Sequence, residues 1–188
     1  MPAPRPDRRA RLTAEGWALL GLTAALGLAG WLAGNNVLLL LVAGLLALWA
    51  LDAVLGAWNL RHLEVRRVLP AEPFAGQRAP GAFRLANRRS WLPTVDVAVA
   101  DAAGGAHAYV GRIPADDEVQ VPTAWRFDGR GPARLPDLRL ESRFPFGLVH
   151  RSRIQPHAEA LLVYPAPRGH EPAGRPGRSG ADGIASAG

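Results

Sequence analysis

The feature that most constrains this chain is an apolar run, because residues 16–51 contain no charged side chain. As one α-helix, a run of this length would measure about 54 Å, whereas the hydrocarbon core of a bilayer is only about 30 Å thick. The tripeptide Gly34-Asn35-Asn36 interrupts the run near its middle, and Gly and Asn commonly end helices. The sequence therefore predicts a hairpin of two transmembrane helices, residues 17–33 and 37–58, joined by a very short loop.

A secretory signal peptide is the alternative interpretation of the first apolar segment, with Arg8, Arg9 and Arg11 as its basic region. A signal peptide has an apolar core of about 7–15 residues followed by a cleavage site. Here a second long apolar segment follows at once, so cleavage would leave a mature chain that is still bound to the membrane. The hairpin is the better interpretation.

Arginine and tryptophan set the expected position of this hairpin. The chain has a net charge of +6 and contains no Lys, so its basic residues are all Arg. Arg precedes the first predicted helix and follows the second, while the loop between the helices has none, which predicts that both termini are cytoplasmic. The flanking arginines are Arg5, Arg8, Arg9, Arg11, Arg61, Arg66 and Arg67. Four tryptophans are expected near the helix ends, at the membrane interfaces: Trp17, Trp31, Trp49 and Trp58.

Asp52 is the one acidic residue inside the second predicted helix. A charged side chain at the bilayer centre costs about 2.5–3.5 kcal/mol on insertion scales. Asp52 precedes Trp58 by six residues, so it should lie about 9 Å from the cytoplasmic end of the helix. One hypothesis is a proton or ion relay; the other is a carboxylate near the headgroups that pairs with Arg61 or reaches water. The second is favoured because no other acidic residue lies within the predicted helices.

Small residues recur at four-residue spacing along both predicted helices, which lets helix backbones approach closely in lipid. They predict either packing within the hairpin or a helix-mediated homo-oligomer, and the spacing does not distinguish the two. The residues are Gly21, Ala25, Ala29 and Ala33, the pair Gly30 and Gly34, and the pairs Ala43/Ala47 and Ala53/Ala57.

From residue 63 the pattern changes to short alternating segments separated by clusters of Pro, Gly, Asn and Asp. Seven or eight short strands without a long helical pattern predict an all-β domain over residues 63–165, of the immunoglobulin-like sandwich type. The expected strands are 63–68, 82–87, 95–100, 108–113, 119–127, 138–143, 148–154 and 160–164. Residues 1–16 are expected to form a basic cytoplasmic N-terminus. The Gly/Pro/Ala-rich residues 166–188 are expected to form a flexible tail.

Five short motifs occur along the chain in a fixed order: Gly34-Asn35-Asn36, Asn59-Leu60-Arg61, Arg130-Gly131, Ser142-Arg143-Phe144-Pro145-Phe146-Gly147-Leu148 and Val163-Tyr164-Pro165. In this order the chain resembles the N-terminal part of the bacterial family known as domain of unknown function fifty-eight. The resemblance implies a multi-pass protein of the bacterial inner (plasma) membrane, encoded beside a cytoplasmic AAA+ ATPase of the MoxR type and transglutaminase-like membrane proteins, with the ATPase as the expected partner. It also marks ten motif residues as structural: Asn35, Asn36, Arg130, Gly131, Phe144, Pro145, Phe146, Gly147, Tyr164 and Pro165.

The second conserved region of that family, with its Arg-Glu-Tyr, Gly-Asp and Ile-x-Trp pattern, has no counterpart in this sequence. The chain is therefore expected to be a truncated member or the front half of a split one.

No residue pattern indicates catalysis, a cofactor or a metal. The chain has no Cys, which excludes disulfides and thiolate chemistry. The histidines are not at ligand spacing, the serines lack a nucleophile-elbow context, and the acidic turn at 116–118 lacks the alternating ligands of a calcium loop. The residues considered are His62, His107, His150, His157, His170, Ser90, Ser142 and Ser152. Nucleic-acid binding is not expected, because the arginines alternate with core positions and are not grouped with stacking aromatics.

The sequence thus predicts a protein that is not an enzyme: a membrane-anchored scaffold or interaction module with the lipid bilayer as its first partner. The alternative is an accessory subunit of a transglutaminase-like or peptidase-like enzyme complex of the envelope. Within the β domain, Pro145 and Gly147 are expected to form a corner between strands. Phe144 and Phe146 are expected to pack in the core, with Phe146 as an anchor; a partner-binding role for Phe146 is the second interpretation.

Overall fold

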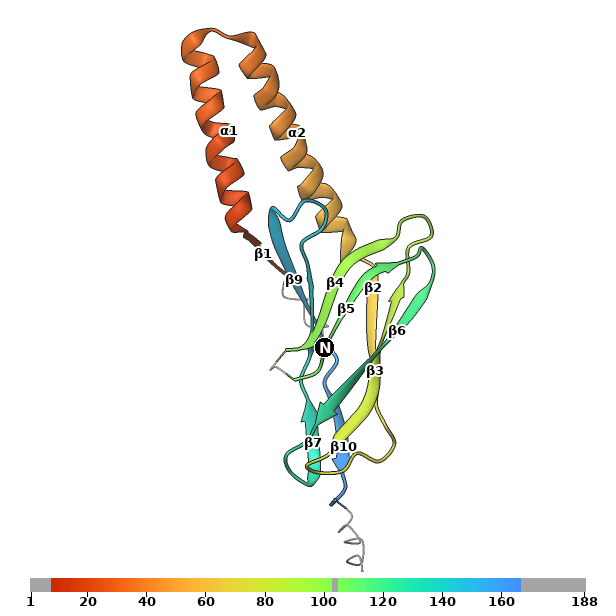
Figure 1. Ribbon diagram of the computed structural model, residues 1–188. Helices are drawn as coiled ribbons and strands as arrows, with labels where there is room; N and C mark the ends of the chain where they lie inside the picture. Colours follow the sequence, from red (N-terminus) through yellow and green to blue (C-terminus); the bar gives the residue numbers. More distant parts are fainter. Residues whose placement is uncertain (1–7, 103–104, 167–188) are drawn as a thin grey trace, which may run out of the picture.

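The computed structural model describes residues 8–102 and 105–166, and it places two long helices on top of a β domain (Figure 1). A short strand, β1 (Arg8–Leu12), leads into the helices α1 (Ala14–Ala33) and α2 (Asn36–Asn59). Nine further strands follow in chain order. The two apolar helices followed by a multi-sheet β domain agree with the predicted fold class at this level.

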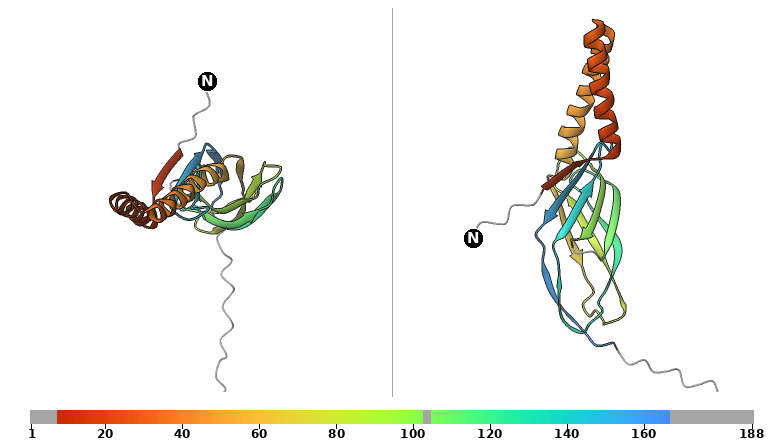
Figure 2. Two further views of the ribbon diagram at one scale, coloured as in Figure 1. Left: turned by 90° about the horizontal axis from the view of Figure 1, so that it is seen from above. Right: turned by 90° about the vertical axis from the view of Figure 1, so that its left-hand side faces the viewer.

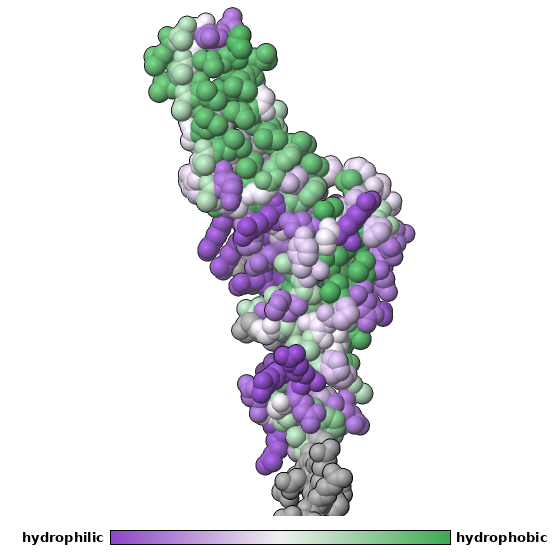
Figure 3. All heavy atoms as spheres, viewed as in Figure 1, coloured by the Kyte–Doolittle hydropathy of each residue, from purple (hydrophilic) through white to green (hydrophobic). Residues whose placement is uncertain are grey.

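The ends of both helices lie within three residues of the ends predicted from the sequence. Gly34 ends α1 in the left-handed conformation with φ of 59°, where a residue with a Cβ would be strained. Asn35 then begins α2, because its side chain accepts hydrogen bonds from the amides of Val37 and Leu38. Both helices are long and apolar enough to cross a membrane, and the space-filling view shows an almost continuous apolar surface over them (Figure 3).

The helices pack through Gly30, where an added Cβ would lie 3.0 Å from the Leu38 Cβ. Gly21, Ala25, Ala29 and Ala33 of the predicted small-residue stripe are exposed instead, so this stripe does not form the contact between α1 and α2. Trp49 also differs from its predicted place at a helix end. It lies ten residues before Asn59, so it is about 15 Å from the end of α2.

The strands form three antiparallel groups. A five-stranded sheet has the order β1-β9-β8-β4-β5, a three-stranded sheet has the order β2-β3-β6, and β10 pairs with β7. The bounds are β2 (Leu63–Val68), β3 (Arg78–Asn87), β4 (Thr94–Asp101), β5 (His107–Ile113), β6 (Glu118–Arg126), β7 (Gly131–Leu135), β8 (Leu138–Ser142), β9 (Val149–Gln155) and β10 (Glu159–Val163). The right-hand view of Figure 2 shows the domain as an elongated body that continues the long direction of the hairpin, and the left-hand view looks down on the molecule from the side of the helices.

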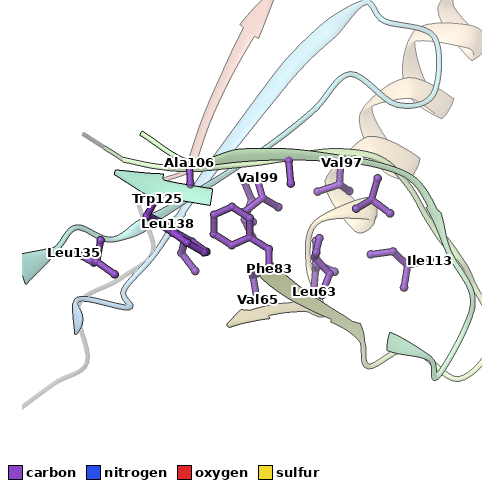
Figure 4. Close-up of a cluster of buried hydrophobic side chains, with 14 of the residues drawn as sticks. Leu63, Val65, Phe83, Val97, Val99, Ala106, Ile113, Trp125, Leu135 and Leu138 are labelled. Atoms are coloured by element: carbon purple, nitrogen blue, oxygen red, sulfur yellow. The ribbon is translucent and has the colours of Figure 1, made fainter. Parts of the chain in front are cut away.

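The core lies between the three-stranded and five-stranded sheets (Figure 4). Phe83 on β3 is fully buried and meets Trp125 on β6 edge to face, with 5.3 Å between ring centroids. Leu63 and Val65 on β2 point toward Val99 and its neighbours on β4. Alternate residues of β2 are buried and exposed, which is the period-two pattern from which the strand was predicted.

Two strands were not predicted from the sequence. The Arg-rich segment at the N-terminus contains β1, which pairs with β9 from Arg8↔Arg153 to Leu12↔Val149. No strand was expected within the basic residues 1–16, but backbone pairing with β9 orders residues 8–12 as a strand despite their charge. Gly131 was expected in a turn but begins β7, opposite Val163 of β10. Residues 1–7 and the predicted tail beyond residue 166 lie outside the described residues.

Candidate functional site

Several long-range polar contacts lie at the junction, which is defined as Thr13, residues 52–59 of α2 and the loop between β8 and β9 (residues 143–148). Asp52 on α2 has no exposed side-chain surface. Its Oδ2 accepts a hydrogen bond at 2.9 Å from Nη2 of Arg151 on β9, and the same Nη2 reaches the Asp52 carbonyl at 2.9 Å. Asp52 was expected to pair with Arg61 or to reach water. It pairs with an arginine 99 residues further along the chain instead.

The loop between β8 and β9 approaches α2 closely, and in Figure 1 it reaches up beside the lower end of the helix. The amide of Phe146 donates to Asp52 Oδ1 at 3.4 Å. The side chain of Phe146 is 45% exposed, so the prediction that it anchors the core was wrong. Its backbone is held by α2 through Asp52, which leaves the ring at the surface. Phe144 in the same loop is half-buried.

Gly56 explains how α2 and this loop can lie so close together. A Cβ on Gly56 would lie 2.8 Å from the Phe144 carbonyl oxygen and would collide with the guanidinium of Arg151. No larger residue fits here without moving the helix away from the loop. Gly56 is therefore a packing requirement of the junction.

Asn59, the last residue of α2, ties the helix to β4 and β8. Its Nδ2 donates to the Val95 carbonyl at 2.6 Å and to Ser142 Oγ at 2.9 Å, while its Oδ1 accepts from the Val95 amide at 3.0 Å. Arg89 donates to the Asn59 carbonyl at 2.5 Å. All polar atoms of this buried amide side chain thus have partners, and α2 enters the domain without a flexible linker.

Thr13 fixes the other helix. Its Oγ1 caps α1 by accepting from the Gly16 amide at 3.0 Å, and the same hydroxyl donates to the Gly147 carbonyl at 2.7 Å. The Thr13 amide donates to the Leu148 carbonyl at 3.0 Å. Both helices are therefore bonded to the same loop between β8 and β9.

A second buried ion pair lies within the β domain and joins its sheets. Arg67 on β2 donates to Asp101 on β4 at 2.6 Å and to the carbonyls of Pro136 and His157. The second oxygen of Asp101 accepts from Trp125 Nε1 at 3.0 Å. Arg67 was counted as a membrane-flanking charge from the sequence, but its side chain is 0% exposed. It acts as a structural tie between sheets.

Two arginines near the junction carry a cost of burial. Burial lowers the pKa of Arg89, and burial followed by the nearby charge of Arg8 lowers the pKa of Arg153. Arg153 donates from Nη1 to the carbonyls of Leu60 and Arg61, at 2.8 and 3.3 Å. Its Nε has no hydrogen-bond partner among the described residues. Strongly polar residues lie directly below the hairpin on the face shown in Figure 3.

The ten motif residues fall into three separate places. Asn35 caps α2 and Asn36 is its first residue, while Phe144, Pro145, Phe146 and Gly147 lie at the junction. Arg130, Gly131, Tyr164 and Pro165 lie together at the opposite end of the domain, because Gly131 pairs with Val163. Tyr164 forms an isolated bridge with Phe74, and their rings are 6.3 Å apart. Arg151 was not identified from the sequence as the partner of Asp52. The signal that was present is its alternation with Arg153 along β9.

Across residues 8–102 and 105–166, no group of three or more His, Asp or Glu side chains is placed to hold a metal ion. Ser142, considered as a nucleophile, instead accepts from Asn59 and from the Phe144 amide at 3.2 Å. No family model matches the chain, and a search of curated proteins found no similar one. The junction fixes the β domain to the pair of apolar helices.

Proposed function

We propose that this chain is a membrane-anchored scaffold or interaction module of the bacterial inner membrane. In this proposal the hairpin crosses the bilayer twice, and an immunoglobulin-like sandwich is presented on the cytoplasmic side. The observation that carries the proposal is the junction, where Asp52–Arg151 and Asn59–Val95 bond α2 directly to the domain. Such bonding suits a module that must hold its partner at a fixed height and orientation above the membrane.

The pairing of β1 with β9 supports the double crossing. β1 precedes α1 and β9 follows α2, so both ends of the hairpin must return to the same side of the membrane. The arginines that flank the helices favour the cytoplasm as that side. A reporter that is active only in the periplasm, fused after Pro165, should therefore be silent, whereas a cytoplasmic reporter at the same place should be active. The reverse result would contradict the orientation.

The proposed partner is a cytoplasmic AAA+ ATPase of the MoxR type, by resemblance to the family named above. The end of the domain away from the hairpin offers a surface for it, because Leu162 is 55% exposed and Tyr164 is 39% exposed. Since the chain has no Cys, a single Leu162→Cys variant can carry a photo-crosslinker in whole cells. Val37→Cys, at the opposite end of the molecule and 73% exposed, is the matched control.

Adducts with the ATPase are expected from position 162 and not from position 37. Adducts with a transglutaminase-like or peptidase-like membrane protein in place of the ATPase would favour the alternative, an accessory subunit of an envelope enzyme complex. Equal adducts from both positions would contradict a specific interaction surface at the far end of the domain.

A further inference from the structure

A cavity of about 180 Å³ lies below the hairpin, between β1, the last turn of α2, and β9. The residues that line it come from three separate parts of the chain. Five arginines surround it, and no described residue that lines it is acidic. The arginines are Arg8, Arg9, Arg61, Arg151 and Arg153.

The position of this cavity relative to the proposed bilayer follows from the lengths of the helices. α1 has 20 residues, so it is about 30 Å long, which matches the hydrocarbon thickness. Counting the same number of residues along α2 from Asn36 ends at Leu55. Gly56 and Ala57, which line the cavity, are the next two residues. The cavity therefore lies just outside the hydrocarbon, in the layer that holds lipid headgroups.

Exposed aromatic side chains mark the same layer. Trp17 in the first turn of α1 is 62% exposed, and Trp58 near the end of α2 is 39% exposed. Trp91, from the loop before β4, is 68% exposed and packs edge to face on Trp58 at 6.3 Å. Tryptophan favours the boundary between lipid and water. The β domain itself thus contributes an aromatic residue to the boundary.

We propose that this cavity binds the phosphate of an anionic phospholipid headgroup. Guanidinium groups offer paired donors that match phosphate oxygens. Arg151 already pairs with Asp52 and Arg153 donates to two carbonyls, so Arg8 and Arg61, both exposed, are the main phosphate ligands, and Ser152 adds a hydroxyl to the lining. Gly56, Ala57 and Leu60 form an apolar wall on α2, beside which the lipid tails continue into the bilayer. Burial lowers the pKa of Arg153, and a bound phosphate would offset that penalty.

The proposal rests on the proposed insertion of the hairpin into a membrane. Arg8 and Arg61 are the residues to change, because both are exposed and, among the described residues, neither side chain donates a hydrogen bond to the junction. The test variant is Arg8→Gln with Arg61→Gln. The matched control is Arg78→Gln with Arg126→Gln, which removes the same charge from two exposed residues that pair at the far end of the domain.

The experiment is native mass spectrometry of the full chain in detergent, with equimolar dioleoylphosphatidylglycerol and dioleoylphosphatidylcholine. The phosphatidylglycerol should be retained preferentially. The test variant should lose about tenfold or more of this affinity, since each cation near the surface contributes on the order of 1 kcal/mol, and the control should match the parent. Far-UV circular dichroism of each variant verifies that it is folded.

Equal retention of the two lipids, or an equal loss in the control, would overturn the headgroup site alone. Inorganic phosphate that displaces phosphatidylglycerol and binds as well without acyl tails would overturn the choice of a lipid as the ligand. A chain that stays soluble without detergent and retains neither lipid would overturn both this site and the proposed membrane anchor.

Discussion

The core of the β domain and the junction each contain one buried Arg–Asp pair, but the two pairs have different surroundings. Arg67 and Asp101 are 0% and 2% exposed, and Asp101 also binds Trp125. Arg151 and Asp52 are 12% and 0% exposed. The first pair is enclosed by two sheets of one domain, whereas the second joins the domain to a pair of apolar helices that project from it.

This difference shows that the same kind of ion pair can stabilise a domain core in one place and attach two parts of the chain in another. A buried charge that loses its partner is costly because it cannot return to water. In the core no solvent is near, so the whole domain must bear that cost. At the junction Arg151 is partly exposed, so it can reach water once the hairpin separates from the loop. Breaking the first pair should unfold the domain, and breaking the second should uncouple its attachment.

The largest effect is expected from Asp101→Ala. This change leaves the Arg67 cation buried and removes the acceptor of Trp125 Nε1, at a cost of about 3–5 kcal/mol. The melting temperature of the full chain in detergent, followed by the β-sheet signal in circular dichroism, should fall by more than 10 °C, at about 4 °C or more per kcal/mol. The control is Glu118→Ala, which removes an exposed pair with Arg84 at 3.8 Å. It should lower the free energy of unfolding by only a few tenths of a kcal/mol. Similar melts for both variants would contradict the structural role of the core pair.

A smaller and more local effect is expected from Asp52→Ala. Loss of the charge-assisted hydrogen bonds should weaken the junction by about 2–3 kcal/mol while leaving the sheets intact. Hydrogen exchange should accelerate at the Phe146 amide, which donates to Asp52, and at the Thr13 amide, which donates to Leu148. The amides between β3 and β6 serve as the internal control. If they accelerate equally, the two regions are not separable.

Gly56→Ala should affect the junction without changing any charge. The new Cβ would lie 2.8 Å from the Phe144 carbonyl oxygen, so the helix or the loop must shift, at a cost of about 1–2 kcal/mol. Faster exchange at the Phe146 amide, with a normal melt of the β-sheet signal, is the expected result. Gly44→Ala is the matched control, because a Cβ there meets nothing within 4 Å. Equal behaviour of the two variants would show that the close approach is not required.

The smallest effect on stability is expected from Phe146→Ala. Its ring is 45% exposed, so truncation should change the free energy of unfolding by less than about 1 kcal/mol. Phe83→Ala, at a fully buried position, should cost about 3–5 kcal/mol. The two melts measured together compare the surface of the junction with the core directly. A large loss from Phe146→Ala would restore the original prediction of a core anchor.

Sequence patterns predicted the helical hairpin and most of the strands, because these elements depend on interactions between residues close together in the sequence. The hairpin follows from hydropathy together with Gly34 and Asn35, which end and begin the helices as expected. Most strands follow from alternation. β1 was missed because Arg8, Arg9 and Arg11 match a membrane flank as well as a strand, and β7 because Gly131 and Pro132 resemble a turn.

The junction could not be predicted in the same way, since its partners are far apart in sequence. Asp52 and Arg151 are 99 residues apart, and Asn59 and Ser142 are 83 residues apart. No local pattern specifies such contacts. Phe146 illustrates the same limit: an aromatic residue in a tight corner matches a core residue, and only the position of α2 shows that the corner lies at the domain boundary.

The pairing of β1 with β9 has a consequence for synthesis. Residues 13–148 separate the two strands, so at about 5–20 residues per second β1 must wait on the order of 10 s for its partner. Arg occupies three of its five positions, and charge on an unpaired strand discourages incorrect pairing in the interval. β1 can pair with β9 only when both ends of the hairpin lie on the same side of it. Completion of the five-stranded sheet therefore depends on correct formation of the hairpin that separates its two halves in the sequence.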